Sequence, residues 1–335
     1  MALAVTFLFG LVCMSMALVQ GVSSIFLVLL ALRFFGFGSL QMVSNNVIAQ
    51  WFVRRRGIVM GLSGLSLTIG LVVFPTLAQS LIDQFGWRGA WIMMGLLVWL
   101  IMLPVGGFIF KDRPELYGLQ PDGDAYDIGR RPTPNQGWVA EEDWTLAEAR
   151  KTRAFWIFAL ALAAMSMIMA GLIFHQISLF EVRGLSRQNA VDAYKAIAFF
   201  SIIGNLSMGR LLDRFSARLL LSITLLLLVT TLITVQIMTT PLQAFIYAAT
   251  IGLVSGCFRV LDGVVWPKYY GRRYLGAIKG MTMIGVLGAT ALGPYPIGVS
   301  FDIWGSYAPA LNSLMLFPLT ISVVVLFINR PQKPV

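Results

Sequence analysis

Two charged residues lie inside an otherwise apolar stretch, where a charge needs a physical reason. Arg259 and Asp262 are three residues apart within 242–266, so a helix there would place both on one face. A charge at the centre of a membrane helix costs about 2.5–3.5 kcal/mol on insertion scales, unless it is paired or hydrated. Two hypotheses follow. Arg259 binds a carboxylate, with Asp262 as its partner or as a proton carrier, or the residues form a structural ion pair between helices.

A short polar turn between two apolar stretches carries a second group of charges. The segment "GRLLDRFSARLLL", residues 209–221, contains Asp213, Arg214 and Arg218. Asp213 near a helix end could pair with one of these arginines and with the N-terminus of a neighbouring helix, where backbone N–H groups favour a negative charge. Such a contact would hold one side of the molecule closed and break when its halves move. The alternative is that the arginines only fix orientation in a membrane.

Single polar groups inside apolar stretches allow two interpretations each. His175, the only histidine, could titrate near neutral pH and couple protons, or could simply be hydrogen-bonded at a helix end. Arg33 precedes Gly36 and Gly38 and either binds a ligand or only snorkels towards the membrane interface or braces the bundle. Lys279 either snorkels or contacts a substrate, and we expect it to snorkel. A polar stripe at i, i+4 spacing, which either lines a cavity or bonds a neighbouring helix, comprises Gln41, Asn45, Asn46 and Gln50.

The elements that position these residues follow from composition. The chain has 335 residues, of which 58% are hydrophobic and 12% charged, whereas soluble domains carry about 25% charged residues. Backbone polar groups must be satisfied internally in lipid, so each long apolar stretch predicts an α-helix. The alternation of a membrane β-barrel is absent. We expect ten spans, at 2–20, 25–50, 57–81, 89–110, 154–179, 193–212, 217–238, 242–266, 276–299 and 308–328.

The loops between these spans differ in charge. Three basic residues, Arg33, Arg259 and Lys279, lie well inside spans, and the remaining 22 of the 25 lysines and arginines lie in loops, at the termini or at the ends of spans. Only four of these are on one set of alternating loops: Arg88, Arg183, Arg187 and Lys195. The positive-inside rule therefore predicts that the other loops and both termini are cytoplasmic. The net charge of +10 indicates membrane orientation, with no nucleic-acid partner.

The chain also repeats itself at an offset of 219 residues. The matched pairs are Gly57 and Gly276, Gly61 and Gly280, Pro75 and Pro294, Asp83 and Asp302, and Gly86 and Gly305. Such a repeat predicts two equivalent halves: an incomplete N-terminal bundle of four spans at 1–112, a cytoplasmic linker at 113–152 and a C-terminal six-helix bundle at 153–330. The same offset places about 65 further residues, enough for two spans, ahead of Met1. Thr145 and Glu148 fit a capping box, which predicts a short helix at the end of the linker.

These motifs resemble a known family. Gly209-x-x-x-Asp213-Arg214-x-x-x-Arg218 resembles the second-half loop signature of the major facilitator superfamily, with Ser216 and Ala217 where glycine and a basic residue are common. Three segments resemble its monocarboxylate transporter and oxalate/formate antiporter branch: "WFVRRRGIVMG" at 51–61, which contains Arg54, Arg55 and Arg56, "RFFGFG" at 33–38 and "FHQISLFEVRGLS" at 174–186. The resemblance implies twelve helices in two bundles, of which this chain has ten, a central cavity, and movement of small organic anions coupled to protons or another solute.

The sequence thus predicts an all-α polytopic membrane protein with a major facilitator fold, acting as a secondary transporter of a monocarboxylate-like anion in the plasma (inner) membrane by alternating access. The alternative is a transporter-like sensor or a non-transporting remnant. No enzyme motif such as Cys-x-x-Cys or His-Glu-x-x-His is present, and no cofactor or metal is expected. We expect a monomer. The predicted substrate-binding residues are Arg259, Asp262, His175, Arg33, Asn45 and Asn46, and the predicted gating residues are Gly209, Asp213, Arg214, Arg218, Arg54, Arg55 and Arg56.

Overall fold

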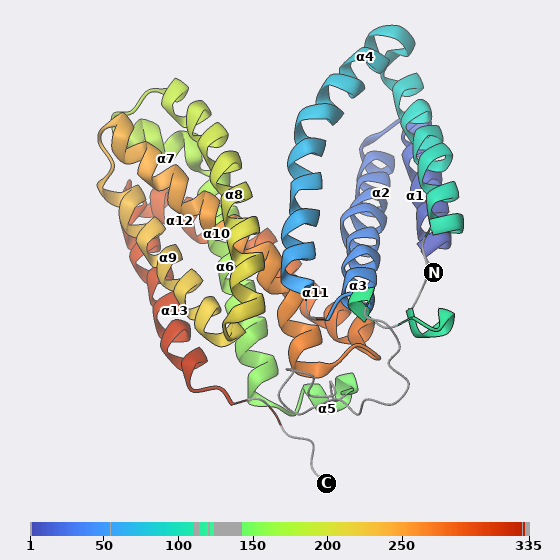
Figure 1. Cartoon of the computed structure of the whole chain (residues 1–335). Helices are drawn as coiled ribbons and strands as arrows, with labels where there is room; N and C mark the ends of the chain where they lie inside the picture. Colours follow the sequence, from blue (N-terminus) through green and yellow to red (C-terminus); the bar gives the residue numbers. More distant parts are fainter. Residues whose placement is uncertain are drawn as a thin grey trace. The chain divides into compact units, whose positions relative to one another are not determined.

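The computed structural model describes residues 2–53, 55–109, 114–119, 121–123, 143–329 and 331, and every regular element in them is helical (Figure 1). The first part contains α1 (Ala2–Ser15), η1 (Met16–Leu18), α2 (Val22–Leu32), η2 (Arg33–Leu40), α3 (Gln41–Trp51), α4 (Arg56–Pro104), η3 (Val105–Ile109), η4 (Pro114–Tyr117) and η5 (Pro121–Gly123). The second part contains α5 (Leu146–Ala149), α6 (Arg153–Phe174), α7 (Gln176–Val182), α8 (Arg187–Arg214), α9 (Ala217–Ile237), α10 (Pro241–Tyr270), α11 (Leu275–Leu292), α12 (Pro294–Trp304) and α13 (Ala308–Leu326).

The apolar stretches are helices, as the sequence predicts. In the described residues, eight helical segments are long and apolar enough to cross a membrane, and Ala2–Leu18 is a shorter apolar helix. The predicted spans 57–81 and 89–110 form two legs of α4, which turns at Gly86 (Figure 1). Gly86 has φ 66°, a left-handed conformation that glycine adopts without a steric penalty. The predicted span 276–299 is divided into α11 and α12 where Pro294 begins a new helix.

The chain forms two compact units, each described by itself. The first contains residues 1–53 and 66–128. Within it, α1 packs against the second leg of α4: the rings of Phe7 and Trp99 stack with centroids 4.8 Å apart, and Trp99 Nε1 donates to the carbonyl of Phe7. Arg88 Nε and Nη2 donate to the carbonyls of Ala17 and Val19 at the end of η1. Arg88 is therefore held by the chain segment that follows α1.

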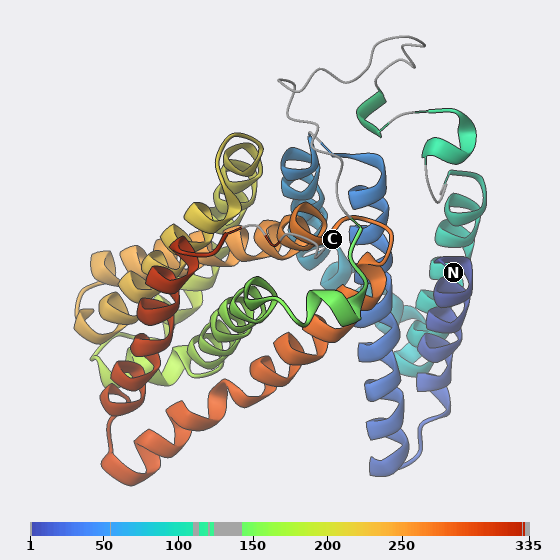
Figure 2. The ribbon, with the colours of Figure 1, turned by 90° about the horizontal axis from the view of Figure 1, so that it is seen from below.

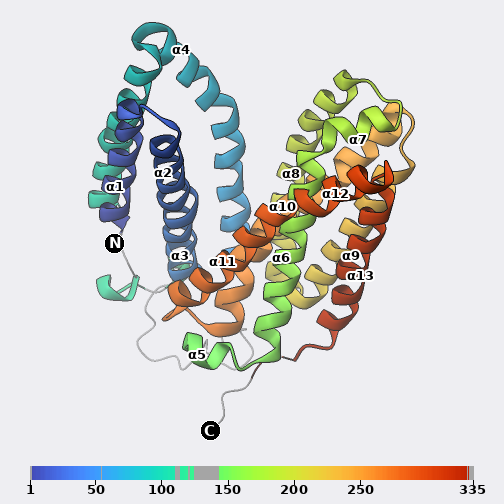
Figure 3. The same ribbon diagram turned by 180° about the vertical axis from the view of Figure 1, so that it is seen from behind.

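The second unit contains residues 54–65, the beginning of α4, together with 129–335. Its helices α8 and α10 pack closely, because Gly204 and Gly256 let each backbone approach the other. Helix α13 runs beside α9, and α11 packs against α6 (Figure 3). The largest fully buried side chains include Trp266, Tyr247, Tyr270, Phe155, Phe158 and Phe180. Most of these aromatic residues come from α6 and α10.

The end of the predicted linker is ordered by the capping box that its sequence indicates. The backbone N–H of Glu148 donates to Thr145 Oγ1, and Glu148 Oε2 accepts from the backbone N–H of Thr145 at 2.7 Å. This reciprocal pair satisfies two helix-terminal donors and starts α5. The prediction of a short helix there is confirmed.

Candidate functional site

A buried ion pair joins α10 to α11. Lys279 Nζ lies 3.0 Å from Asp262 Oδ2, and the two side chains are 6% and 26% exposed. Trp266 Nε1, one turn along α10, donates to Asp262 Oδ1 at 3.4 Å. The expectation that Lys279 snorkels is wrong, because its ammonium group is held inside the bundle by a carboxylate.

Arg259 lies one turn before Asp262 on α10. Its Nη1 atom is buried and has no hydrogen-bond partner within the described residues, whereas Asp262, the partner suggested by sequence spacing, binds Lys279. Leaving a donor of a charged group buried and unpaired costs more than the 1–3 kcal/mol of a neutral group. The cluster of Arg259, Asp262 and Lys279 carries two positive charges and one negative charge. Its arrangement therefore favours an additional anion at the Arg259 guanidinium.

Aromatic packing fixes the position of this cluster. The rings of Trp266 and Tyr270 stack with centroids 6.3 Å apart, and Phe155 of α6 contacts Trp266 at 5.5 Å. Both Trp266 and Tyr270 are fully buried. Sequence spacing missed Lys279 as a partner because it is 17 residues from Asp262, across the turn between two helices. The position of Lys279 inside an apolar stretch was the signal in the sequence that it has a buried partner.

The polar turn predicted as a gate makes a specific contact with the start of α4. Asp213 Oδ1 accepts from the backbone N–H of Gly57 at 3.0 Å, and Oδ2 accepts from that of Ile58 at 3.3 Å. A carboxylate is favourable there because the first N–H groups of a helix have no intrahelical partner. Gly209 and Gly57 lie backbone to backbone, so a Cβ on either residue would collide with the other. The closest approach of α4 and α8 and the charge of Asp213 thus lie at the same place.

The arginines of the predicted gate have different surroundings. Arg218 Nη1 donates to the carbonyl of Ile328 after α13, at 3.0 Å. Arg56 is 2% exposed, whereas Arg55 and Arg214 are exposed. Arg54 lies outside the described residues. The contact with the N-terminus of α4 is made by Asp213.

Sequence analysis missed Asn205, which lies one turn before Gly209 on the same face of α8. Its side chain is fully buried, and neither its oxygen nor its nitrogen has a hydrogen-bond partner within the described residues. Its side-chain amide lies against Gly64, and its backbone carbonyl lies against Gly61. The i, i+4, i+8 series of Asn205, Gly209 and Asp213 was visible in the sequence, but the apolar segment facing it was not.

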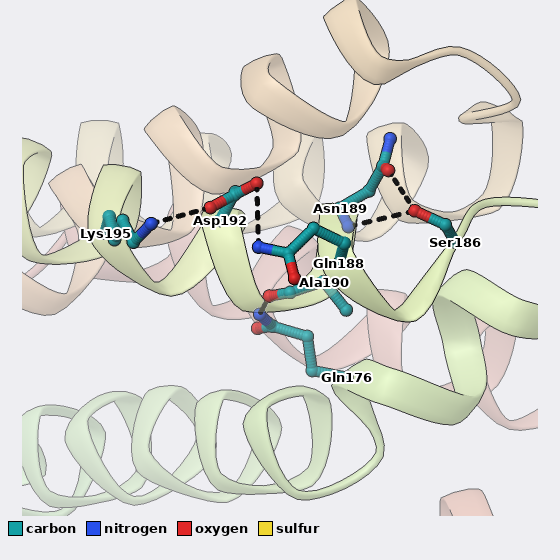
Figure 4. Close-up of polar contacts among 7 residues, drawn as sticks. All are labelled: Gln176, Ser186, Gln188, Asn189, Ala190, Asp192 and Lys195. Carbon is teal, nitrogen blue, oxygen red and sulfur yellow. Dashed lines mark hydrogen bonds and ion pairs between the residues drawn. The ribbon is translucent and has the colours of Figure 1, made fainter.

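His175 and Gln176 lie where α6 ends and α7 begins. His175 Nε2 is 3.0 Å from the carbonyl of Pro294, and since a carbonyl only accepts, this nitrogen carries the proton. Gln176 is fully buried and donates through Nε2 to the carbonyl of Ala190 at 2.9 Å (Figure 4). The Asp192–Lys195 pair at 2.8 Å on the same helix as Ala190 is exposed to solvent (Figure 4). These contacts tie α6 and α7 to α8 and α12.

The remaining predicted residues belong to the first unit. Arg33 is exposed and begins the π-helical stretch η2. Asn45 and Asn46 lie half-buried on α3, and Asn46 Oδ1 is buried without a hydrogen-bond partner in the described part of the chain. The structure brings Asp262 and Lys279 together, and Asp213 and Gly57, within the second unit.

The long apolar helices are those of a multi-pass integral membrane protein. The family model for the Major Facilitator Superfamily matches residues 1–294, so the chain belongs to that superfamily. This confirms the predicted fold class and the expectation of a non-enzymatic protein.

Solved structures share the fold of this chain. The crystal structure of FucP in the outward conformation is similar with a TM-score of 0.65 and 14% identity, covering 99% of this chain and 82% of FucP. The crystal structure of a single-residue variant of the E. coli fucose:proton symporter FucP gives 0.67 and 15%, covering 99% of this chain and 83% of that one. At these identities the likeness concerns the fold alone.

Two curated relatives are similar in sequence. The uncharacterized MFS-type transporter YhjX of Escherichia coli K12 is 25% identical over 257 residues, which are 75% of this chain and 58% of YhjX. Mouse monocarboxylate transporter 6 is 38% identical over 52 residues, which are 16% of this chain and 11% of the transporter. The chain therefore spans less than two thirds of the length of either relative.

Proposed function

We propose that the protein is a secondary transporter that moves a small monocarboxylate-like anion by alternating access, with Arg259 as the residue that binds the carboxylate. The observation that carries this proposal is the buried Nη1 of Arg259, which has no hydrogen-bond partner in the described residues. A guanidinium presents a planar fork of donors that matches a carboxylate. An incoming carboxylate would satisfy this donor and remove the cost of its burial.

The charges around Arg259 support a singly charged substrate. Lys279 is neutralised by Asp262 at 3.0 Å, so one positive charge in the cluster is left without a counter-charge. A monoanion balances that charge, whereas a dianion would leave a net negative charge at a partly buried site. The 52-residue similarity to mouse monocarboxylate transporter 6 agrees with this class of substrate.

The Asp213 contact supports a gate. Its carboxylate binds two N–H groups at the start of α4 at 3.0 and 3.3 Å, and both bonds are lost if α4 and α8 separate. Because water can take the place of either partner in these bonds, the contact can break without leaving a buried charge. We infer that it closes the face that carries the basic loops, which the positive-inside rule places in the cytoplasm. Tags at 54–56 and 239–241 that react from the same side of intact cells would contradict this orientation.

Uptake into proteoliposomes tests the substrate proposal. Radiolabelled formate, acetate, lactate and pyruvate are offered to the wild type and to Arg259→Ala and Arg259→Lys. We expect saturable uptake of at least one monoanion by the wild type, and its loss in Arg259→Ala. Arg259→Lys should retain part of it, because charge remains but the planar fork does not.

Arg187→Ala is the matched control, since Arg187 is an exposed arginine at the start of α8. It should transport like the wild type. If Arg259→Ala transports with an unchanged KM, Arg259 does not bind the substrate. Binding of a monoanion without uptake would favour the sensor.

A further inference from the structure

The predicted linker ends in a segment, residues 143–152, that docks on the turn between α10 and α11 (Figure 2). Asp143 Oδ1 accepts from the backbone N–H groups of Arg272 and Arg273 at 3.1 and 3.0 Å. The next residue, Trp144, donates its backbone N–H to the carbonyl of Tyr270 at 3.0 Å and is only 2% exposed. Gly271, with φ 76°, makes the turn that presents these groups.

Tyr270 is held by this segment on several sides. Its ring meets the ring of Trp144 edge to face, with centroids 5.9 Å apart, and its hydroxyl lies 2.7 Å from Thr152 Oγ1. Its carbonyl accepts from Trp144. A fully buried aromatic ring that is fixed at its edge, its hydroxyl and its backbone has little freedom to shift.

From Tyr270 the contacts continue to the charged cluster. The ring of Trp266 stacks on that of Tyr270 at an interplanar angle of 25°. The Trp266 indole donates to Asp262, which in turn pairs with Lys279. Moving Tyr270 therefore moves the indole that orients one oxygen of Asp262 while the other binds Lys279.

We propose that the segment 143–152 is a positioning element of the Asp262–Lys279 pair, with Trp144 as its central residue acting through Tyr270 and Trp266. Undocking the segment loosens the pair and makes Lys279 accessible. Where it concerns substrate affinity, this inference rests on the proposed function. Where it concerns the order of the ion pair, it stands on the contacts alone.

The other end of the predicted linker makes a related contact in the first unit. Asp122 Oδ2 accepts from the backbone N–H of Val53 at 3.1 Å. Val53 is the repeat mate of Arg272 at the offset of 219 residues. An aspartate from each end of the linker thus binds the backbone of the equivalent loop in each half, so docking of the linker on these loops follows the internal repeat of the fold.

Amine labelling tests the positioning of the pair without any transport. The purified protein reacts with a water-soluble acetylating reagent, and mass spectrometry follows Lys279 and Lys195. Lys195, whose side chain is 76% exposed, is the internal reference. We expect Trp144→Ala to raise the labelling rate of Lys279 about 2- to 30-fold, the range by which contacts remote from a site change local equilibria. The rate at Lys195 should not change.

Trp144→Phe keeps an aromatic edge against Tyr270 and should restore protection of Lys279. Asp143→Asn, which removes the charge from the two backbone bonds without emptying the aromatic packing, should give an intermediate rate. Arg187→Ala, at an exposed arginine at the start of α8, is the matched control because it leaves the Lys195 reference untouched. Unchanged labelling of Lys279 in both Trp144→Ala and Asp143→Asn, with the protein folded, would overturn the proposal.

Uptake kinetics separate this inference from the proposed function. For a monoanion that the wild type transports, Trp144→Ala should raise KM by a similar factor, and Trp144→Phe should restore it. If Arg259→Ala leaves uptake intact while Trp144→Ala exposes Lys279, the proposed function fails and the positioning role stands. If Arg259→Ala abolishes uptake and Lys279 stays protected in Trp144→Ala, the positioning role fails alone.

Discussion

The contact between α4 and α8 leads to a sharp prediction for Gly57→Ala. A Cβ at Gly57 would clash with the carbonyl oxygen of Gly209 and would lie 2.7 Å from Asp213 Oδ1. The carbonyl belongs to the backbone of α8 and cannot rotate away. Overpacking of this kind costs about 1–3 kcal/mol. Because the penalty exists only while the helices touch, it should shift the equilibrium towards their separated state about 5- to 150-fold.

Cysteine labelling measures that shift. Asn205→Cys places a thiol at the same contact, where the native side chain is fully buried, and the native cysteines Cys13 and Cys257 are buried as well. Maleimide should react at this position at a rate set by the fraction of molecules in which α4 and α8 are apart. We expect the Gly57→Ala, Asn205→Cys double variant to react about 5- to 150-fold faster than Asn205→Cys alone.

Gly285→Ala is the matched control for this experiment. A Cβ at Gly285 in α11 meets nothing within 4 Å, so the substitution should leave the labelling rate unchanged. It should also stabilise the helix by about 0.5–1 kcal/mol. Equal labelling rates with and without Gly57→Ala would refute the reasoning, because they would show that the close approach of Gly57 and Gly209 does not hold the helices together.

Three further predictions concern stability. Asn205→Leu should raise the free energy of unfolding by about 1 kcal/mol, because it replaces a buried amide without partners in the described structure by an apolar group of similar size; a lower Tm in detergent would contradict this. Lys279→Met should destabilise the protein by about 3 kcal/mol or less, because the Asp262 carboxylate that loses its partner is 26% exposed. The double variant Lys279→Met, Asp262→Asn should recover most of the lost stability. Thr145→Ala should remove about 1 kcal/mol from the capping box and speed amide exchange in α5, while exchange in α9 serves as the reference.

The sequence predicts the parts of this structure that depend on local pattern. Apolar runs of membrane length specify the helices, and Thr145 with Glu148 specifies α5. The position of Asp213 near a helix end predicts that its carboxylate accepts hydrogen bonds from the backbone N–H groups of a neighbouring helix. These inferences succeed because hydrogen bonding within a helix and capping of its ends involve residues a few positions apart.

The partners of the buried polar groups could not be predicted in the same way. Arg259 and Asp262 suggested a pair by spacing, yet the carboxylate binds Lys279 on the next helix, and only the packing of α10 against α11 decides between the two cations. The sequence gives no sign that Asn205 is special, because an asparagine in a helix is common and its burial depends on the residues that face it. Both cases concern contacts between helices, which sequence periodicity does not specify.

The three aspartates Asp122, Asp143 and Asp213 share one mode of contact, a carboxylate on backbone N–H groups of the loop or first turn that precedes a repeat-related helix. Hydrogen bonds to a charged group contribute about 1.5–3 kcal/mol each. The two bonds of Asp213, whose side chain is exposed, therefore contribute at most about 3–6 kcal/mol, and reversing a two-state population from 99:1 to 1:99 requires about 5.5 kcal/mol. A contact of this size is strong enough to populate a closed state. It is also weak enough that an anion that binds Arg259 only in the open state could reverse the preference for the closed state. The binding energy of one such anion could not separate an extensive apolar interface.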